Sequence, residues 1–118
     1  MAVEIEKTEG FEIVPLTERD LEEVMLIERA SFVAPWSVGM FRQDLDFPLA
    51  RCLAARWSEA GEKRLAGYII CWFVADEVHI TNIAVRTDRR NRGVAGRLVE
   101  EALDMARECR MQSCTLEV

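Results

Sequence analysis

The feature that most limits the fold of this chain is a long amphipathic segment near its C-terminal end. Residues 94–110 have the strongest helical period in the sequence, with an apolar stripe on one side and charged residues on the other. The stripe consists of Leu98, Ala102, Met105 and Cys109, with Val99, Leu103 and Ala106 beside them. We therefore predict a helix that buries one face and exposes the other.

Shorter segments around this helix indicate a sheet. Runs rich in β-branched and aromatic residues, bounded by polar or Gly- and Pro-containing turns, predict strands. These runs are residues 11–15, 50–57, 66–74, 78–85 and 113–118. The polar stretch 58–63 reads as a hairpin turn, and we expect a mostly antiparallel sheet.

Two further helices are expected between the first two strands. Thr17 can cap one that extends to about Ala30, with Asp20 in the third position of a capping box. Ser37 can cap the other, after a break at Pro35-Trp36. The order of elements predicts a single α/β (α+β) domain over residues 1–118, with helices flanking the sheet.

The composition bounds the class of protein. The chain has 118 residues, half of them apolar, as in an ordinary globular domain. The formal net charge of −6 argues against general binding to nucleic acid and favours a cationic partner. The single histidine, His79, and the four cysteines lack metal-ligand spacing, so free thiols are favoured over a zinc site. The cysteines are Cys52, Cys71, Cys109 and Cys114.

Neither a targeting signal nor a membrane span is expected. Residues 1–10 are acidic and lack the apolar core of a signal peptide. The longest apolar run, residues 68–75, is too short to cross a bilayer. We therefore expect a cytoplasmic protein without membrane contact.

The stretch that precedes the amphipathic helix is rich in arginine and glycine. Residues 89–97 read RRNRGVAGR. Free N–H groups and the positive end of the helix dipole make a helix N-terminus suitable for an anion. Gly93 and Gly96 would let a diphosphate approach the main chain, and the arginines could pair with its outer oxygens. A capped turn with solvated arginines is the alternative, and spacing alone favours neither.

Other motifs fit this stretch poorly. No Lys-Ser/Thr pair follows the glycines, as a Walker loop requires, and GxGxxG is absent. An RNA-binding loop is disfavoured because no aromatic platform surrounds the arginines. We therefore do not expect direct binding to nucleic acid.

Three blocks together resemble a known family. Residues 90–95, RNRGVA, fit the (Gln/Arg)-x-x-Gly-x-(Gly/Ala) loop of the GNAT superfamily of N-acetyltransferases, and the strand ITNIAV precedes them. IERASFVAPWS at 27–37, NIAVRTDRRNRGVAGRLVEEAL at 82–103 and LEV at 116–118 follow the order of the ribosomal-protein-alanine N-acetyltransferases. The resemblance to that group covers nearly the whole chain.

The resemblance implies how acetyl-CoA would bind, without a metal. The molecule is expected between the strand before the loop and the strand after the long helix. Its pantetheine arm would hydrogen-bond to the backbone of Ile83, Ala84 and Val85, and its pyrophosphate would rest on the loop. The cofactor-binding residues of the loop are then Arg90, Asn91, Arg92, Gly93, Val94, Ala95 and Gly96. Arg90 for Gln and Ala95 for Gly depart from the commoner pattern but stay within the range of the family.

The resemblance also implies the chemistry, which is transfer of an acetyl group from acetyl-CoA to a protein N-terminal α-amine. Glu117 would be the catalytic base, acting through a water, and N–H groups around Ile83 could polarise the thioester carbonyl. Trp36 would belong to the substrate-binding wall. The alternatives are an outward-facing strand residue for Glu117 and a packing role for Trp36.

The pKa of the substrate amine favours an α-amine. At pH 7 an α-amine with a pKa near 8 is about 10% neutral, whereas a lysine amine with a pKa near 10.4 is about 0.04% neutral. A single carboxylate therefore suits an α-amine better, and an acidic protein suits the N-terminal peptide of a basic ribosomal protein. Two alternatives stay open: a non-catalytic module that binds acyl-CoA or a partner, and an acetyltransferase of small amines.

The sequence lacks segments with which the family pattern continues. After the strand at 113–118, family members have another helix, which carries the Tyr assigned as general acid, and a closing hairpin. Tyr68, the only tyrosine, lies on an earlier strand and is no evident substitute. An unpaired apolar strand edge invites pairing with another chain, so we expect self-association through residues 113–118.

Overall fold

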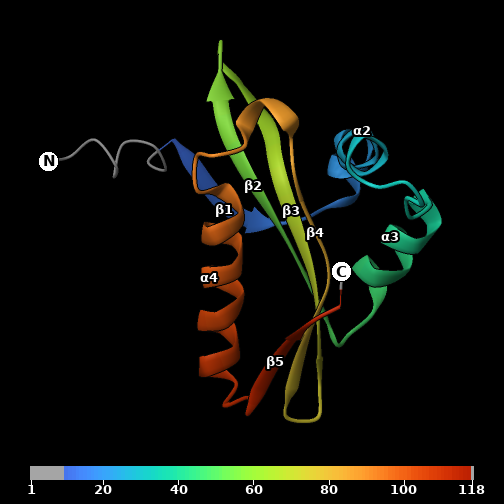
Figure 1. Cartoon of the computed structure of the whole chain (residues 1–118), viewed down its shortest axis with the longest axis vertical. Helices are drawn as coiled ribbons and strands as arrows, with labels where there is room; N and C mark the ends of the chain where they lie inside the picture. The colour runs from blue at the N-terminus through green and yellow to red at the C-terminus, as the bar shows by residue number, and fades with distance from the viewer. Residues whose placement is uncertain (1–9, 118) are drawn as a thin grey trace, which may run out of the picture.

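In a computed structural model that describes residues 10–117, five strands form one sheet and helices cover both of its faces (Figure 1). The strands are β1 (Phe11–Pro15), β2 (Ala50–Glu59), β3 (Glu62–Val74), β4 (Glu77–Val85) and β5 (Ser113–Leu116). The helices are α2 (Leu21–Ser31), α3 (Val38–Asp46) and α4 (Val94–Glu108), with 3-10 turns η1 (Glu18–Asp20) and η2 (Thr87–Arg89). Our expectations for residues 1–9 and Val118 lie outside the described residues.

The strands lie in the order β1-β2-β3-β4-β5. All neighbours are antiparallel except β4 and β5, which are parallel, and the predicted mostly antiparallel α/β fold is confirmed. The ladder between β4 and β5 joins residues 77–80 to residues 113–116 only. Among the described strands, the second half of β4 therefore has a partner only on its β3 side, which leaves its other edge free beside the start of α4.

The hairpin between β2 and β3 is tighter than the predicted polar turn at 58–63. Ser58 pairs with Lys63 and Glu59 pairs with Glu62, so only Ala60 and Gly61 remain in the turn. Both have positive φ, 52° and 84°, as a two-residue turn that follows the strand twist requires. Polar residues near the exposed end of the hairpin still pair in the ladder. The turn is therefore shorter than the polar stretch 58–63 predicts.

The two faces of the sheet carry separate cores. α4 covers one face, while α2 and α3 cover the other (Figure 1). The buried seam of α4 consists of Val94, Leu98, Ala102 and Ala106. This seam confirms the predicted amphipathic helix, except that Cys109 follows the last helical residue and is exposed.

The predicted helix starts are confirmed with one difference. The Thr17 N–H donates to Asp20 Oδ2 at 2.8 Å, which completes the capping box. The turn after it is a 3-10 turn, so α2 begins only at Leu21. Ser37 Oγ accepts from the Met40 N–H at 3.3 Å and caps α3. Within residues 10–117, no helix has the length and apolarity that spanning a membrane demands.

Candidate functional site

A cavity of about 450 Å³ lies where β4 ends and α4 begins. Its wall is formed by the end of β4, the loop before α4, the first turn of α4 and the C-terminal end of α2. Nine of the predicted cofactor-binding residues line it, namely Ile83, Ala84, Val85, Arg90, Asn91, Gly93, Val94, Ala95 and Gly96. Arg92 does not line it. We call this space the loop cavity.

The N-terminus of α4 offers unsatisfied amides to the loop cavity. Gly93 occupies the N-cap position with a φ of 83°, and in the described part of the chain no side chain caps this helix. Its first turn also lacks an acidic residue. By contrast, the first turn of α2 carries Glu22 and Glu23, and Asp20 caps the turn before it. The N-terminus of α4 therefore keeps its positive partial charge for an anion from outside.

Gly96, in the first turn of α4, is not required by the packing of the protein. A Cβ built at this position meets no heavy atom within 4 Å. Glycine inside a helix costs about 1 kcal/mol relative to alanine. A glycine that weakens its helix and lines a cavity leaves space that a ligand can use.

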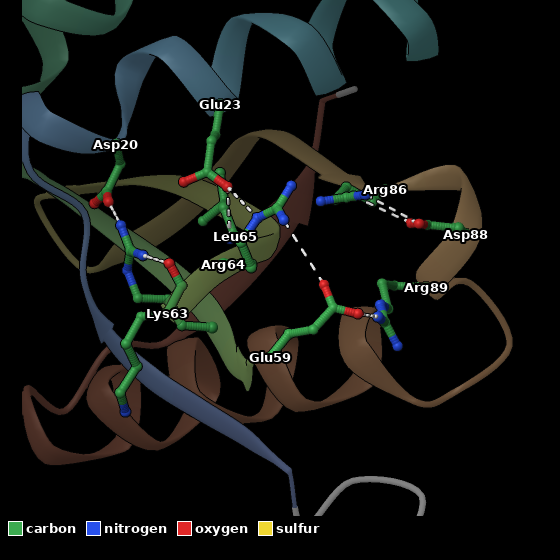
Figure 2. Close-up of polar contacts among 10 residues, drawn as sticks. Asp20, Glu23, Glu59, Lys63, Arg64, Leu65, Arg86, Asp88 and Arg89 are labelled. Atoms are coloured by element: carbon green, nitrogen blue, oxygen red, sulfur yellow. Dashed lines mark hydrogen bonds and ion pairs between the residues drawn. The ribbon is translucent and has the colours of Figure 1, made fainter. Parts of the chain in front are cut away.

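Arg89, at the start of the loop, is held by the β2–β3 hairpin. Its Nη2 lies 3.4 Å from Glu59 Oε2, and Glu59 Oε1 lies 3.7 Å from Nη1 of Arg64 (Figure 2). The Arg89 Cζ lies 3.9 Å from the ring centroid of Trp57, and the Arg86 Cζ lies 5.1 Å from the same ring. Arg89 thus anchors the loop to the hairpin, and its charge is already used within the protein.

The other three arginines of the loop divide into two kinds. Arg90 Nε donates to the Val85 carbonyl at 3.1 Å, and Nη2 donates to Ser31 Oγ at 3.4 Å, so Arg90 closes the loop against β4 and α2. Across residues 10–117, no acidic side chain forms an ion pair with Arg92 or Arg97. Among the described residues Arg90 has no acidic partner either, and it lines the loop cavity, so of the four arginines proposed from the sequence only Arg89 has its charge paired with a carboxylate.

A second cavity, of about 620 Å³, contains the other two predicted site residues. We call it the aromatic cavity, because two tryptophans line it together with polar groups from α3, β4 and the residue after β5. The residues used below are Trp36, Asp44, Trp72, His79 and Glu117. Burial raises the pKa of Asp44, and its hydrogen bond with Trp72 opposes that rise. Carboxylates between aromatic rings suit a cationic or amine group.

His79 lines the aromatic cavity, and its contacts could not be predicted from the sequence. Its Nδ1 lies 2.5 Å from Glu117 Oε2 and 3.2 Å from Thr115 Oγ1, and its Nε2 lies 3.1 Å from Glu77 Oε1. The hydrogen bond to Glu117 is the main cause of a raised His79 pKa, and the charges of Glu117 and Glu77 add to it against desolvation. His79 faces Thr115 only through the parallel register of β4 and β5. No spacing along the chain signals that register.

Two other groups considered from the sequence have different surroundings. Tyr68 is completely buried, and its hydroxyl donates to Glu28 Oε1 at 2.5 Å. Burial and this bond raise its pKa, and Tyr68 lines neither cavity, so it does not take the place of a general acid. All four cysteines are free thiols. In the described residues, no three His, Cys, Asp or Glu side chains form a group that could hold a metal ion.

Comparison with known proteins agrees with the resemblance. The model of the acetyltransferase (GNAT) family matches residues 21–118. A protein of Bacillus subtilis, provisionally named a ribosomal protein bS18-alanine N-acetyltransferase, is 32% identical over 100 residues, which are 84% of this chain and 64% of the relative. The chain thus spans less than two thirds of the length of that relative.

Solved structures share the fold. The ribosomal-protein-S18-alanine N-acetyltransferase of Escherichia coli superposes with a TM-score of 0.77 at 24% identity, over 90% of this chain and 65% of that one. The PaiA N-acetyltransferase of Thermoplasma acidophilum, in complex with coenzyme A, gives 0.76 at 16% identity, over 90% of this chain and 77% of that one. Because the family model covers most of the sequence, the chain belongs to the acetyltransferase (GNAT) family.

Proposed function

We propose that this chain binds acetyl-CoA and transfers its acetyl group to the α-amine at the N-terminus of a protein. The observation that carries the proposal is the loop cavity, in which uncapped amides of α4 lie beside the free edge of β4. A pyrophosphate can bind to such amides, and an amide-containing arm can pair with such an edge. The cavity thus combines the two features that a coenzyme A molecule uses.

The groups in and around the loop cavity have different roles in binding acetyl-CoA. The α4 amides hold the pyrophosphate. Arg92 and Arg97 do not line the cavity, but they are next to lining residues in the sequence and add positive charge beside it.

In the β3–β4 ladder the Arg86 N–H donates to the Ala66 carbonyl, so by alternation the backbone groups of Ala84 face β3 and those of Ile83 and Val85 face the free edge. The Val85 carbonyl already accepts from Arg90, so pairing with the pantetheine arm falls mainly to Ile83. Ile83 lines the cavity.

The aromatic cavity receives the amine. Bound acetyl-CoA supplies the acetyl group as a thioester. Glu117 accepts the proton of the amine, directly or through a water, and His79 holds the Glu117 carboxylate by its hydrogen bond. Trp36 and Trp72 form walls, and Asp44 adds negative charge that attracts an ammonium group.

Two observations support a more specific substrate: the charge of the protein and the names of two similar proteins. The acidic groups of the aromatic cavity and the net charge of −6 favour a basic N-terminal peptide. Two relatives carry names that specify an alanine of a ribosomal protein. We therefore propose the N-terminus of a basic ribosomal protein, in the cytoplasm, as the substrate.

Self-association through residues 113–118 is part of the same proposal. β5 is exposed along its length and, among the described strands, pairs only with β4. Light scattering at rising protein concentration tests it, with a mass above the monomer expected. Leu116→Lys should reduce that mass, because Leu116 is 65% exposed and its replacement adds charge to the edge.

Calorimetric titration with CoA, followed by acetylation of a peptide array, tests the function. We expect CoA binding, and acetylation of peptides with a free N-terminal alanine but not of the same peptides with a blocked N-terminus and a free lysine. Binding without release of thiol from any amine would instead indicate a non-catalytic module. Turnover of a polyamine or aminoglycoside, but of no peptide, would indicate a small-amine acetyltransferase.

A further inference from the structure

Glu28, on α2, is a buried carboxylate that the proposed chemistry does not use. It is 1% exposed, and three donors converge on it. The Tyr68 hydroxyl and Asn82 Nδ2 donate to Oε1 at 2.5 and 2.9 Å, and the Trp36 N–H donates to Oε2 at 2.9 Å. Within residues 10–117 no cation pairs with it. Burying a carboxylate is costly, and here hydrogen bonds alone offset that cost.

The three donors come from segments that are far apart in the sequence. Trp36 lies in the loop between α2 and α3 and lines the aromatic cavity. Asn82 lies on β4 between Thr81, which lines the aromatic cavity, and Ile83, which lines the loop cavity. One carboxylate therefore ties a wall of the aromatic cavity to the strand that separates the two cavities.

β4 is irregular at the point where Glu28 binds it. Ile70 pairs with Asn82 and Cys71 pairs with Ile80, so Thr81 is an extra residue on β4. A bulge of this kind bends its strand and re-aims the side chains near it. Asn82 is 2% exposed and directed at Glu28, so the carboxylate holds the bulged backbone from the α2 side.

We propose that Glu28 is a positioning residue for the acetyl transfer: it fixes the Trp36 loop against the bulge of β4, and so sets the place of the amine relative to the thioester. The inference rests on the proposed function. It goes beyond that function because Glu28 touches neither cavity and acts only through Trp36 and Asn82.

The chemistry of the three partners distinguishes two substitutions. A tyrosine hydroxyl can accept as well as donate, and an asparagine amide can turn to present its oxygen, whereas the Trp36 N–H can only donate. In Glu28→Gln, the side-chain oxygen can still accept from the Trp36 N–H. The new side-chain NH2 can then donate to Tyr68 and Asn82, which become acceptors. In Glu28→Met, of similar size, the Trp36 N–H loses its acceptor.

The first test is the steady-state kinetics of both variants with an N-terminal alanine peptide, together with CoA affinity by calorimetry. Glu28→Met should raise the KM for the peptide about tenfold or more and change the Kd for CoA less than twofold. Glu28→Gln should change the KM less than threefold. The control is Asp20→Asn, at another carboxylate that is 1% exposed; Asp20 pairs with Arg56 and caps η1 away from both cavities. The same kinetic pattern in the control, or an unchanged KM in Glu28→Met, would overturn the proposal.

A second measurement does not depend on turnover. Hydrogen exchange at the Trp36 amide should be at least tenfold faster in Glu28→Met than in the wild type, while exchange at the α4 amides stays the same. If the wild type acetylates no peptide, the proposed function fails, and this exchange rate still shows whether Glu28 holds the loop. Unchanged exchange at Trp36 would contradict the inference. If Glu28→Met does not fold, Glu28→Ser, which also cannot reach Trp36, takes its place in both measurements.

Discussion

The two cavities beside β4 are built in different ways. The loop cavity is formed largely by one stretch of chain, residues 83–96, and its main binding groups are backbone amides. The aromatic cavity collects side chains from α3, β3, β4, the loop before α3 and the residue after β5. A motif in the sequence describes the first kind of site, because its parts are adjacent along the chain. The second kind exists only once distant strands have paired.

The largest effect is expected in the aromatic cavity. Glu117→Gln should lower kcat at pH 7 by about 100- to 1000-fold if Glu117 is the base. The deficit should shrink as the pH rises, because more of the amine is then neutral without help. The measurement is kcat against pH for both proteins. A loss of constant size across the range would mean that Glu117 only positions the substrate.

The next effect belongs to the loop cavity. Gly93→Val should weaken CoA binding by about 100-fold, because a β-branched residue does not keep a φ of 83° and the amides that it aligns would move. The matched control is Gly61→Val, at a φ of 84° in the β2–β3 turn. Both variants should lose similar stability in thermal unfolding, but only Gly93→Val should lose CoA in calorimetry. If Gly93→Val bound CoA as tightly as the wild type, the loop would not be part of the CoA site.

A smaller effect separates the arginines of the loop. Arg92→Gln should weaken CoA binding by about three- to tenfold and reduce its dependence on salt, because an exposed charge acts through a screened interaction. Arg107→Gln, at the other end of α4, where Arg107 pairs with Asp104 at 2.7 Å, is the control and should bind as the wild type does. The measurement is the CoA affinity at several ionic strengths. Identical salt slopes in both variants would argue against a phosphate contact for Arg92.

The pairing of β4 with β5 should depend on pH through His79. Its pKa is raised in the folded state, chiefly by Glu117, so the stabilisation is complete below the ordinary pKa of histidine. It is lost as the pH rises through the raised, folded-state value. Thermal unfolding across this range should show a falling midpoint in the wild type. His79→Gln should make the unfolding midpoint depend less on pH over this range. If the dependence on pH is the same in the variant, other groups cause it.

Most of the fold could be predicted from the sequence, because periodicity is a local signal. The α4 seam, the strands and the caps at Thr17 and Ser37 follow from patterns a few residues long. The polar stretch 58–63 predicts a wider β2–β3 turn than the structure has, because polarity does not distinguish turn residues from exposed residues that pair across the strands.

The candidate site divides in the same way. The sequence predicted which loop residues surround a cavity. It did not predict that Arg89 is bound within the protein, because Arg89 contacts Trp57 and pairs with Glu59 on the β2–β3 hairpin. The partners of His79 and Glu28 could not be predicted from the sequence either, because long-range strand pairing and burial bring them together.

The central claim, that the first-turn amides of α4 hold a pyrophosphate, is tested most directly at Gly96. Gly96→Ala should raise the unfolding midpoint by a few degrees, because alanine stabilises a helix by about 1 kcal/mol and its Cβ meets nothing in the protein. Because Gly96 lines the loop cavity, the added methyl group should also weaken CoA binding by about three- to tenfold in calorimetry. A variant that is more stable and binds CoA less tightly is the predicted result; one that is more stable and binds CoA as tightly as the wild type would contradict the account.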